Sequence, residues 1–210
     1  LGLGSGVQGL LSDDLVAMKS GKRGSVRIIG GRWRGTRLPV PDLPGLRPTG
    51  DRGREVLFNW LQAELPGSRC ADLFAGSGAL GLEAASRGAS RVLLLDNSPV
   101  AVHTIRESLK RLGASESDCR QVEVLQTDAL DWLQNCEAET LDIVFVDPPF
   151  DSGLAIRSLE LLADSACMKR GGLVYVESER RSMNTAPGPG WEIDREKVLG
   201  DVRMMLLKKI

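Results

Sequence analysis

The stretch Asp72-Leu-Phe-Ala-Gly76-Ser-Gly78-Ala-Leu-Gly81 decides the fold of this chain. It contains the spacing G-x-G-x-x-G between an apolar run, which predicts a strand, and residues with helical periodicity. Glycines at these positions let the backbone approach a ligand closely, and the free N–H groups at the helix start point into the same space. The stretch therefore predicts a site for a nucleotide-like ligand at the end of a strand in an α/β sheet.

The chain from Arg69 onward alternates apolar strand-like runs with amphipathic helices. This alternation is typical of a mostly parallel sheet covered by helices on both faces. We expect a Rossmann-like, seven-stranded α/β core, preceded by a small N-terminal β-hairpin and a helix. The expected strands are 70–74, 91–95, 122–126, 142–146, 172–177, 190–195 and 202–208. The expected helices are 79–87, 98–112, 128–134 and 152–165.

The composition describes a globular core that needs no stabilising metal or disulfide, with 210 residues of which 42% are apolar and 26% charged. No apolar run reaches the ~18 residues of a membrane span. The single histidine, His103, argues against a His-rich metal site and against a Ser-His-Asp triad of the usual form. The cysteines lack the short paired spacing of a zinc or redox site. We expect reduced thiols at Cys70, Cys119, Cys136 and Cys167.

The first residues of the chain, 1–17, lack the basic start and the compact apolar core of a secretory signal. We therefore expect residues 1–18 to be a disordered tail or tag, residues 19–66 to form a basic N-terminal extension that binds RNA, and residues 67–210 to form the core. The expected compartment is the cytoplasm. We expect no membrane partner and no bound metal, and we expect the chain to act as a monomer.

Positive charge is concentrated in the N-terminal extension. From Lys19 to Arg54 there are ten Lys or Arg residues against two acidic residues, a net charge of +8 in 36 residues. Guanidinium groups can contact phosphates, and the indole of Trp33 can stack on a base, so this segment predicts a single-stranded RNA surface. The alternative is a solvated hairpin in which Trp33 packs on the core. The expected RNA contacts are Arg27, Arg32, Trp33, Arg34, Arg37, Arg47, Arg52 and Arg54.

Carboxylates lie at the carboxyl ends of the first three strands predicted for the core, namely Asp72, Asp96 and Asp128. Together they would form a cleft for a nucleoside, in which Asp96 accepts hydrogen bonds from ribose hydroxyls; the alternative, helix N-capping, could explain Asp128 alone. Negative charge beside a diphosphate is unfavourable, so Asp72 favours a ligand with ammonium and sulfonium groups, S-adenosylmethionine. The expected cofactor contacts are Asp72, Phe74, Ala75, Gly76, Ser77, Gly78, Asp96, Asn97, Asp128 and Ala129.

The stretch Asp147-Pro148-Pro149-Phe150 follows the predicted strand 142–146. Two prolines remove two N–H donors, so the turn offers mainly acceptors, the Asp147 carboxylate and backbone carbonyls. These acceptors would orient an amine on a planar base while Phe150 stacks on the ring, and attack on a sulfonium methyl would then need chiefly positioning and electrostatics. The alternative is a strand-ending turn with a capping aspartate. The expected catalytic residues are Asp147, Pro148, Pro149 and Phe150.

Four segments of the chain resemble the RsmD-type small-subunit ribosomal RNA guanine-N2 methyltransferases. They are RIIGGRWRGTRL (27–38), RPTGDRGREVLFNWL (47–61), DLFAGSGALGLEAASRGA (72–89) and DPPF (147–150). The resemblance implies a class I S-adenosylmethionine-dependent methyltransferase core. It also implies that one guanine of 16S ribosomal RNA, position 966 in the usual rRNA numbering, becomes N2-methylguanine. The implied substrate is the small ribosomal subunit or one of its assembly intermediates.

Two positions depart from the family pattern, because Gly50 and Gly53 stand where relatives usually carry Thr and Val. Glycine in a helix costs about 0.5–1 kcal/mol relative to alanine. We therefore expect a looser start of the N-terminal helix and a looser RNA grip through Arg52 and Arg54.

Several alternative functions stay open at this point. An amino-methyltransferase acting on adenine in DNA or on a protein glutamine would use the same acceptor-rich turn. An NAD-dependent oxidoreductase would use the glycine spacing together with Asp96. A non-catalytic RNA-binding module would need only the basic extension.

Overall fold

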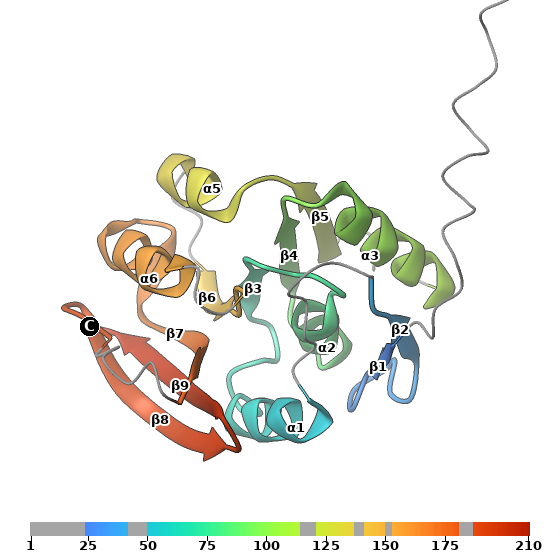
Figure 1. Cartoon of the computed structure of the whole chain (residues 1–210), viewed down its shortest axis with the longest axis horizontal. Coiled ribbons are helices and arrows are strands. Elements are labelled where there is room, and N and C mark those ends of the chain that lie inside the picture. Colours follow the sequence, from blue (N-terminus) through green and yellow to red (C-terminus); the bar gives the residue numbers. More distant parts are fainter. Residues whose placement is uncertain (1–23, 42–49, 114–120, 137–140, 150–152, 181–186) are drawn as a thin grey trace, which may run out of the picture.

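The computed structural model describes residues 24–41, 50–113, 121–136, 141–149, 153–180 and 187–210. The extension contains β1 (Ser25–Arg27), β2 (Arg37–Pro39) and α1 (Asp51–Trp60). The first half of the core contains β3 (Arg69–Asp72), α2 (Ala79–Ser86), β4 (Arg91–Asp96), α3 (Pro99–Arg111), β5 (Val122–Gln126) and α5 (Ala129–Asn135). The second half contains β6 (Leu141–Val146), α6 (Leu154–Asp164), β7 (Met168–Glu179), β8 (Trp191–Leu199) and β9 (Val202–Lys209), as Figure 1 shows.

The core strands form one seven-stranded sheet in the order β5-β4-β3-β6-β7-β9-β8. Strands β5, β4, β3, β6 and β7 pair in parallel, whereas β9 runs antiparallel between β7 and β8. The predicted Rossmann-like, mostly parallel sheet is confirmed. Because parallel strands end at the same edge, the residues that follow β3 to β7 gather on one side of the molecule.

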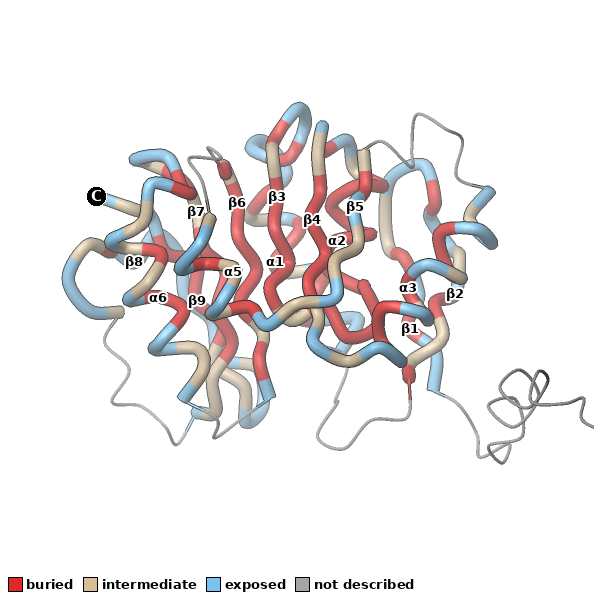
Figure 2. Tube along the Cα trace, turned by 90° about the horizontal axis from the view of Figure 1, so that it is seen from above, coloured by how far each residue is buried: buried red, intermediate tan, exposed pale blue. Residues whose placement is uncertain are grey.

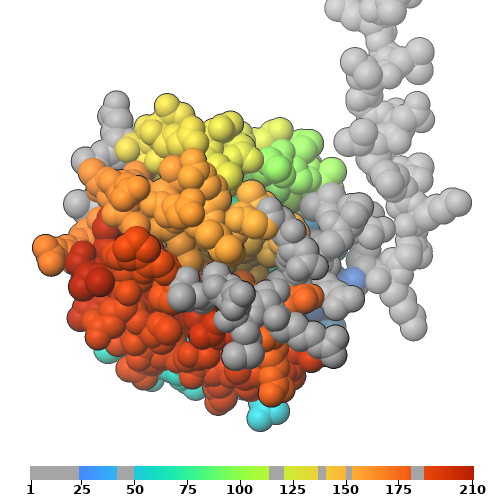
Figure 3. Space-filling view, turned by 60° about the vertical axis from the view of Figure 1, so that its left-hand side comes forward, coloured from blue at the N-terminus to red at the C-terminus, as the bar shows by residue number. Residues whose placement is uncertain are grey.

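Both faces of the sheet are buried, and successive strand residues alternate between two apolar layers. Leu94 and Phe145 pack in the layer that contains α1, α2 and α3, while Leu93 and Val144 pack in the layer that contains α5 and α6. Figure 2 shows the central strands as largely buried traces. On the second face α5 and α6 lie side by side (Figure 3, yellow and orange). Burial on both faces explains why these strands are almost uninterrupted apolar runs in the sequence.

The N-terminal extension packs on α2 through a buried carboxylate. Glu83 accepts hydrogen bonds from the backbone N–H groups of Ile29 and Gly30, both at 2.7 Å. Gly31 has a φ of 74°, and a Cβ atom there would lie 1.9 Å from the carbonyl oxygen of Ser86. The two glycines of the RIIGG segment therefore let the backbone come directly onto the helix.

Helix α1 starts at Asp51 with Gly50 as its N-cap, and Gly50 contributes no side-chain hydrogen bond to the first turn. The N–H of Arg54 donates to the Gly50 carbonyl at 3.1 Å, which closes the first turn. Glycine thus leaves the helix start without the side-chain acceptor that Ser or Thr would provide. That this start is loose stays a prediction.

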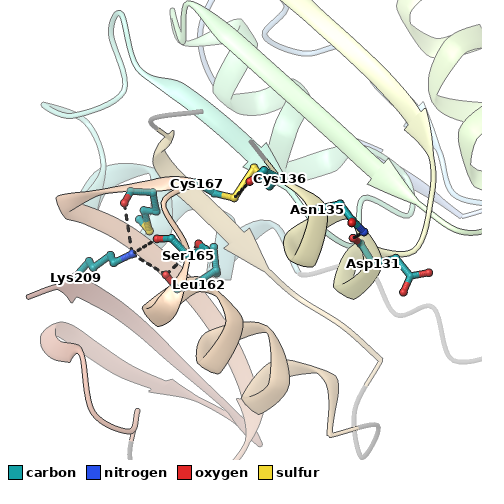
Figure 4. The surroundings of a disulfide bond; sticks show 8 residues. Asp131, Asn135, Cys136, Leu162, Ser165, Cys167 and Lys209 are labelled. Atoms are coloured by element: carbon teal, nitrogen blue, oxygen red, sulfur yellow. Dashed lines mark hydrogen bonds between the residues drawn. A yellow bond between two sulfur atoms is a disulfide. The ribbon is translucent and has the colours of Figure 1, made fainter. Parts of the chain in front are cut away.

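Cys136 and Cys167 form a disulfide between the end of α5 and the start of β7 (Figure 4). The expectation of reduced thiols is wrong for this pair. The carbonyl of Cys167 accepts a hydrogen bond from the N–H of Leu141 at 2.8 Å, so the pairing of β6 with β7 brings the two cysteines together. Cys70 is free and buried, and burial raises the pKa of its thiol to about 12. Cys119 lies outside the described residues.

The predicted strands and helices of the core agree with the structure to within a few residues at most ends. The largest difference is in the expected strand 172–177, which extends over Met168–Glu179 because it pairs with β9 as well as β6. Within the described ranges no helix is both long and apolar enough to cross a membrane. The same ranges contain no cluster of His, Cys, Asp and Glu side chains that could hold a metal ion.

Candidate active site

A cavity of about 770 Å³ opens at the carboxyl ends of the parallel strands. Small-ligand sites commonly have volumes of about 300–1,000 Å³. All the predicted cofactor contacts except Gly78 line this cavity, and so do Asp147, Pro148 and Pro149. The start of α1 and the turn between β8 and β9 complete its wall. The fold therefore brings the two predicted half-sites into one space.

The glycine loop after β3 shapes one side of the cavity. Gly76 and Gly78 have φ values of 53° and 77°, in the left-handed region that glycine tolerates best. Gly78 is the N-cap of α2 and does not itself line the cavity. A Cβ atom on Gly81 would lie 2.2 Å from Cδ2 of Leu94, so this glycine lets α2 pack closely on the sheet. The first two glycines thus set the turn, and the third sets the distance between helix and sheet.

Asp72 is a buried carboxylate at the end of β3. Its Oδ2 accepts a hydrogen bond from the N–H of Gly81 at 3.0 Å, while its Oδ1 has no hydrogen-bond partner among the described residues. Burial, and then the negative charges of Asp147 and Asp96, raise the pKa of Asp72 to about 7. Such an oxygen beside the cavity fits a cationic ligand and disfavours a diphosphate.

Asp96 and Asp128 both line the cavity and both organise backbone around it. Asp96 accepts hydrogen bonds from the N–H groups of Gly76 and Ser98, each at 2.8 Å. Asp128 is the N-cap of α5 and accepts from the N–H of Leu130 at 2.8 Å. Asp128 therefore caps a helix, which was the alternative considered from the sequence, and it also lines the cavity.

The turn after β6 lies on the other side of the glycine loop from Asp96. Asp147 is half-buried, Pro148 is buried and Pro149 is exposed. Strand β6 pairs with β3, with Phe145 opposite Asp72, so the Asp147 turn and the glycine loop leave neighbouring strands. Phe150, the predicted stacking residue, lies outside the described residues.

Several lining residues were not predicted from the sequence. Glu177, near the end of β7, is 5% exposed and lines the cavity. The rule that identified Asp72 and Asp96, an acid where a buried parallel strand ends, would have found it as well. Leu154 at the start of α6 and Val202 and Met204 of β9 were missed because their apolar character signals only a core position.

Most of the predicted RNA contacts in the described residues are exposed. They are Arg27, Arg32, Arg34, Arg37 and Arg52. Arg52 also lines the cavity, which connects the basic surface with the candidate site. Arg47 lies outside the described residues.

Trp33 does not have the position expected of a base-stacking residue. Its side chain is 8% exposed and packs in the core layer that contains Ile28 and Leu38. The guanidinium of Arg32 lies 4.2 Å from the centroid of the Trp33 ring. The alternative considered from the sequence, a hairpin whose Trp33 packs on the core, therefore describes this residue.

Arg54 is likewise not on the surface, because its side chain is fully buried. Its guanidinium donates to Oδ1 of Asp51 at 2.6 Å and to the carbonyl of Arg27 at 2.8 Å, and it lies 3.8 Å from the carboxylate of Glu83. The expectation that Arg54 contacts RNA is corrected here: the side chain joins the hairpin, α1 and α2 to one another.

The chain matches a family model described as "Conserved hypothetical protein 95" over residues 26–208. An Escherichia coli K12 protein named "Ribosomal RNA small subunit methyltransferase D" is 43% identical over 187 residues, which are 89% of this chain and 91% of that protein. A protein of the same name from Haemophilus influenzae is 41% identical, over 88% of this chain and 94% of its own length.

A solved structure described as a putative methyltransferase from Escherichia coli is also similar to this chain. The two share 40% sequence identity and a TM-score of 0.78, over 89% of this chain and 98% of that chain. The similarity therefore covers the hairpin, α1 and the whole sheet, and is not confined to the glycine loop.

Proposed function

The chain belongs to the RsmD-type family of small-subunit ribosomal RNA methyltransferases, and on this premise we propose that it methylates the exocyclic N2 of a guanine in 16S ribosomal RNA. Membership of the family makes the chain an enzyme that uses S-adenosylmethionine and acts on small-subunit rRNA. The acceptor nitrogen and its place in the RNA, position 966 in the usual rRNA numbering, are the proposed part.

One observation carries the proposal, which is that Asp147 shares a single cavity with Asp72, Asp96 and Asp128. Asp72, Asp96 and Asp128 lie at the carboxyl ends of β3, β4 and β5, which are neighbours in the sheet. Asp147 follows β6, the next strand beyond β3. A methyl donor held across the first three strands would lie beside an acceptor held at Asp147. Holding two reactants in this way supplies much of the catalysis of a group transfer.

The residues on the donor side match the parts of S-adenosylmethionine. When bound, this group supplies an electrophilic methyl on a sulfonium. The buried oxygen of Asp72 would face its positively charged end, and Asp96 would accept hydrogen bonds from its ribose hydroxyls. The glycine loop lets the backbone approach closely.

The residues on the acceptor side match an amine that needs orientation. The lone pair of an exocyclic amine is delocalised into the ring, so the amine is a weak nucleophile. Asp147 and the carbonyl of Pro148 would accept its two N–H groups and concentrate electron density on the nitrogen. As the nitrogen gains positive charge during attack, the Asp147 carboxylate stabilises it, and the surplus proton leaves to Asp147 or to water. Phe150 would stack on the base.

The substrate would approach over the basic extension. Arg27, Arg34 and Arg37 offer exposed guanidinium groups, and Arg52 stands at the cavity wall. Such a surface can hold the phosphates of an RNA whose target base enters the cavity. We propose that the RNA is presented in the small subunit or an assembly intermediate, in the cytoplasm, and that the enzyme acts as a monomer.

The proposal is tested by incubating the protein with methyl-labelled S-adenosylmethionine and small subunits from cells that lack this modification. The 16S rRNA is then digested to nucleosides, and the labelled nucleoside is identified by mass spectrometry. We expect N2-methylguanosine at a single position. Label on adenosine, or on ribosomal protein, would contradict the proposed acceptor while leaving the family assignment in place.

A further inference from the structure

Glu177 lies on the acceptor side of the cavity, in register with Asp147. Strand β7 pairs in parallel with β6, with Val146 opposite Val176. Asp147 and Glu177 are therefore the next residues after this pair, at the same level of two neighbouring strands, and both line the cavity. The sheet order β5-β4-β3-β6-β7 places β6 between Glu177 and the donor-side strands. Glu177 is thus positioned to meet the acceptor.

The carboxylate of Glu177 is held from behind by a buried hydroxyl. Oε1 accepts a hydrogen bond from the phenol of Tyr175, whose side chain is fully buried. Burial, and then the neighbouring charges of Glu177 and Asp147, raises the pKa of Tyr175 well above its ordinary value. The phenol therefore keeps its proton and acts as the donor, which fixes the orientation of the carboxylate.

The burial of Glu177 favours a role in binding over a role in folding. A carboxylate that is 5% exposed is costly to keep ionised in a protein interior. Glu83 is also buried, and its hydrogen bonds to Ile29 and Gly30 anchor the extension. Glu177 borders the cavity instead, where a carboxylate can meet a ligand.

Resting on the proposed function, we infer that Glu177 selects guanine by accepting a hydrogen bond from the N1–H of the target base. Asp147 and the Pro148 carbonyl would hold the adjacent N2 amine. Guanine presents N1–H and the N2 amine side by side, whereas adenine at N1 and cytosine at N3 carry lone pairs that would face the carboxylate. A site built to accept a donor strongly rejects bases that present an acceptor there.

The decisive probe is a base with the amine but without the N1 proton. In 2-aminopurine the exocyclic amine stands where it does in guanine, and N1 is an acceptor. Small subunits would be reassembled with 16S RNA carrying either guanine or 2-aminopurine at the target position. The kcat/KM for methyl transfer is measured on both substrates for the wild-type enzyme and for Glu177→Gln, whose amide can donate to N1.

We expect wild type to favour guanine, and Glu177→Gln to lose about 10- to 100-fold in kcat/KM on guanine while gaining on 2-aminopurine. Binding of S-adenosylmethionine, measured by calorimetry, should be unchanged because Glu177 lies away from the donor-side strands. An equal change on both bases would show a merely structural role and would overturn the inference. Lack of methylation at N2 of guanine by the wild type would instead overturn the proposed function.

A second variant keeps the test open if Glu177→Gln does not fold. Tyr175→Phe removes the hydroxyl that orients Glu177 and leaves the carboxylate in place. We expect its preference for guanine over 2-aminopurine to fall several-fold, with the melting temperature recorded as a check on folding. A folded Tyr175→Phe protein with the wild-type preference would contradict the assignment.

Discussion

Oδ2 of Asp96 accepts a hydrogen bond from the backbone N–H of Gly76 at 2.8 Å, across the 20 residues that separate the end of β4 from the glycine loop. The other carboxylate oxygen accepts from the N–H of Ser98, also at 2.8 Å. One side chain therefore fixes the loop after β3 and the start of α3 together. Asp96 shapes the donor site in addition to lining it.

Asp96→Ala should weaken S-adenosylmethionine binding by about 10- to 100-fold, because it removes both the support of the loop and the acceptor proposed for the ribose. Asp96→Asn keeps one acceptor oxygen, so its affinity for S-adenosylmethionine should lie between those of the wild type and Asp96→Ala. Isothermal titration calorimetry measures the effect, and the melting temperature of the free protein controls for damage to the fold. Wild-type affinity in Asp96→Ala would remove this residue from the site.

Asp147→Ala should leave S-adenosylmethionine binding nearly unchanged and reduce turnover by several orders of magnitude, because Asp147 belongs to the acceptor side. Single-turnover methylation of small subunits gives the rate, and calorimetry gives the donor affinity. If both fall together, the variant has lost its fold, and if neither falls, Asp147 does not touch the acceptor.

Asp72 should make the stability of the protein depend on pH. Its pKa is raised from 3.8 to about 7, so between these values the folded protein holds a proton that the unfolded chain has released. The contribution of Asp72 to the free energy of unfolding is therefore most favourable below pH ~4. It falls by up to about 4 kcal/mol as the pH rises to about 7, and then levels off. Urea unfolding of wild type and Asp72→Asn across this range tests it: the advantage of the variant should grow with pH, and parallel curves would speak against the shift.

The arginines of the extension should separate into two classes. Changing Arg32 and Arg34 to alanine should weaken RNA binding and lower the slope of log K against log salt by ~0.7 for each phosphate that is no longer neutralised. The matched control is Arg170→Ala. Arg170 is exposed near the start of β7, at the end of the sheet opposite the cavity, so this change should leave the slope unchanged. An unaltered slope for the Arg32 and Arg34 double variant would exclude those side chains from the RNA surface.

Arg54→Ala belongs to the second class and should act on folding. Removing one partner of a buried ion pair costs about 3–5 kcal/mol when the other charge is left uncompensated. Glu83 keeps the hydrogen bond from Arg87 at 2.7 Å, so we expect a loss of stability below that range. Urea denaturation measures this loss directly. A variant with wild-type stability and weaker RNA binding would restore Arg54 to the RNA surface.

Gly31→Ala should displace the extension, whereas Gly35→Ala should not. Both glycines have positive φ, 74° and 87°, so both substitutions introduce backbone strain. Only at Gly31 would the new Cβ atom lie 1.9 Å from the Ser86 carbonyl oxygen, while at Gly35 no atom lies within 4 Å. We expect Gly31→Ala to lose stability and RNA affinity well beyond the roughly 1–2 kcal/mol strain of Gly35→Ala. Equal losses would show that the contact with Ser86 yields easily.

Much of this architecture could be predicted because it depends on local patterns. The core strands are apolar runs buried on both faces, and the residues after β3, β4, β5 and β6 necessarily meet at one edge. Glu177 could have been found by the same reasoning. The expected strand 172–177 ends on this residue, so its position alone marked it as a strand-ending acid.

What could not be predicted depends on contacts between distant segments. Arg54 and Trp33 belong to residue types that suit RNA, and only the packing of the hairpin on α2 shows that they are buried. The disulfide of Cys136 with Cys167 joins positions 31 residues apart with no recognisable spacing. Residue type and spacing do not show which side chains of a segment will be buried against another part of the chain.

The buried carboxylate of Glu83 also limits how the protein can be divided. It is satisfied from three sides, by the backbone of Ile29 and Gly30, by Arg54 and by Arg87. Deleting the hairpin would uncover this charge in the middle of α2, directly behind the loop that starts the donor site. The N-terminal extension is therefore not an independent module. Removing it to obtain a smaller catalytic fragment would destabilise the core, and the isolated extension would lose the contacts with α2 that hold its backbone.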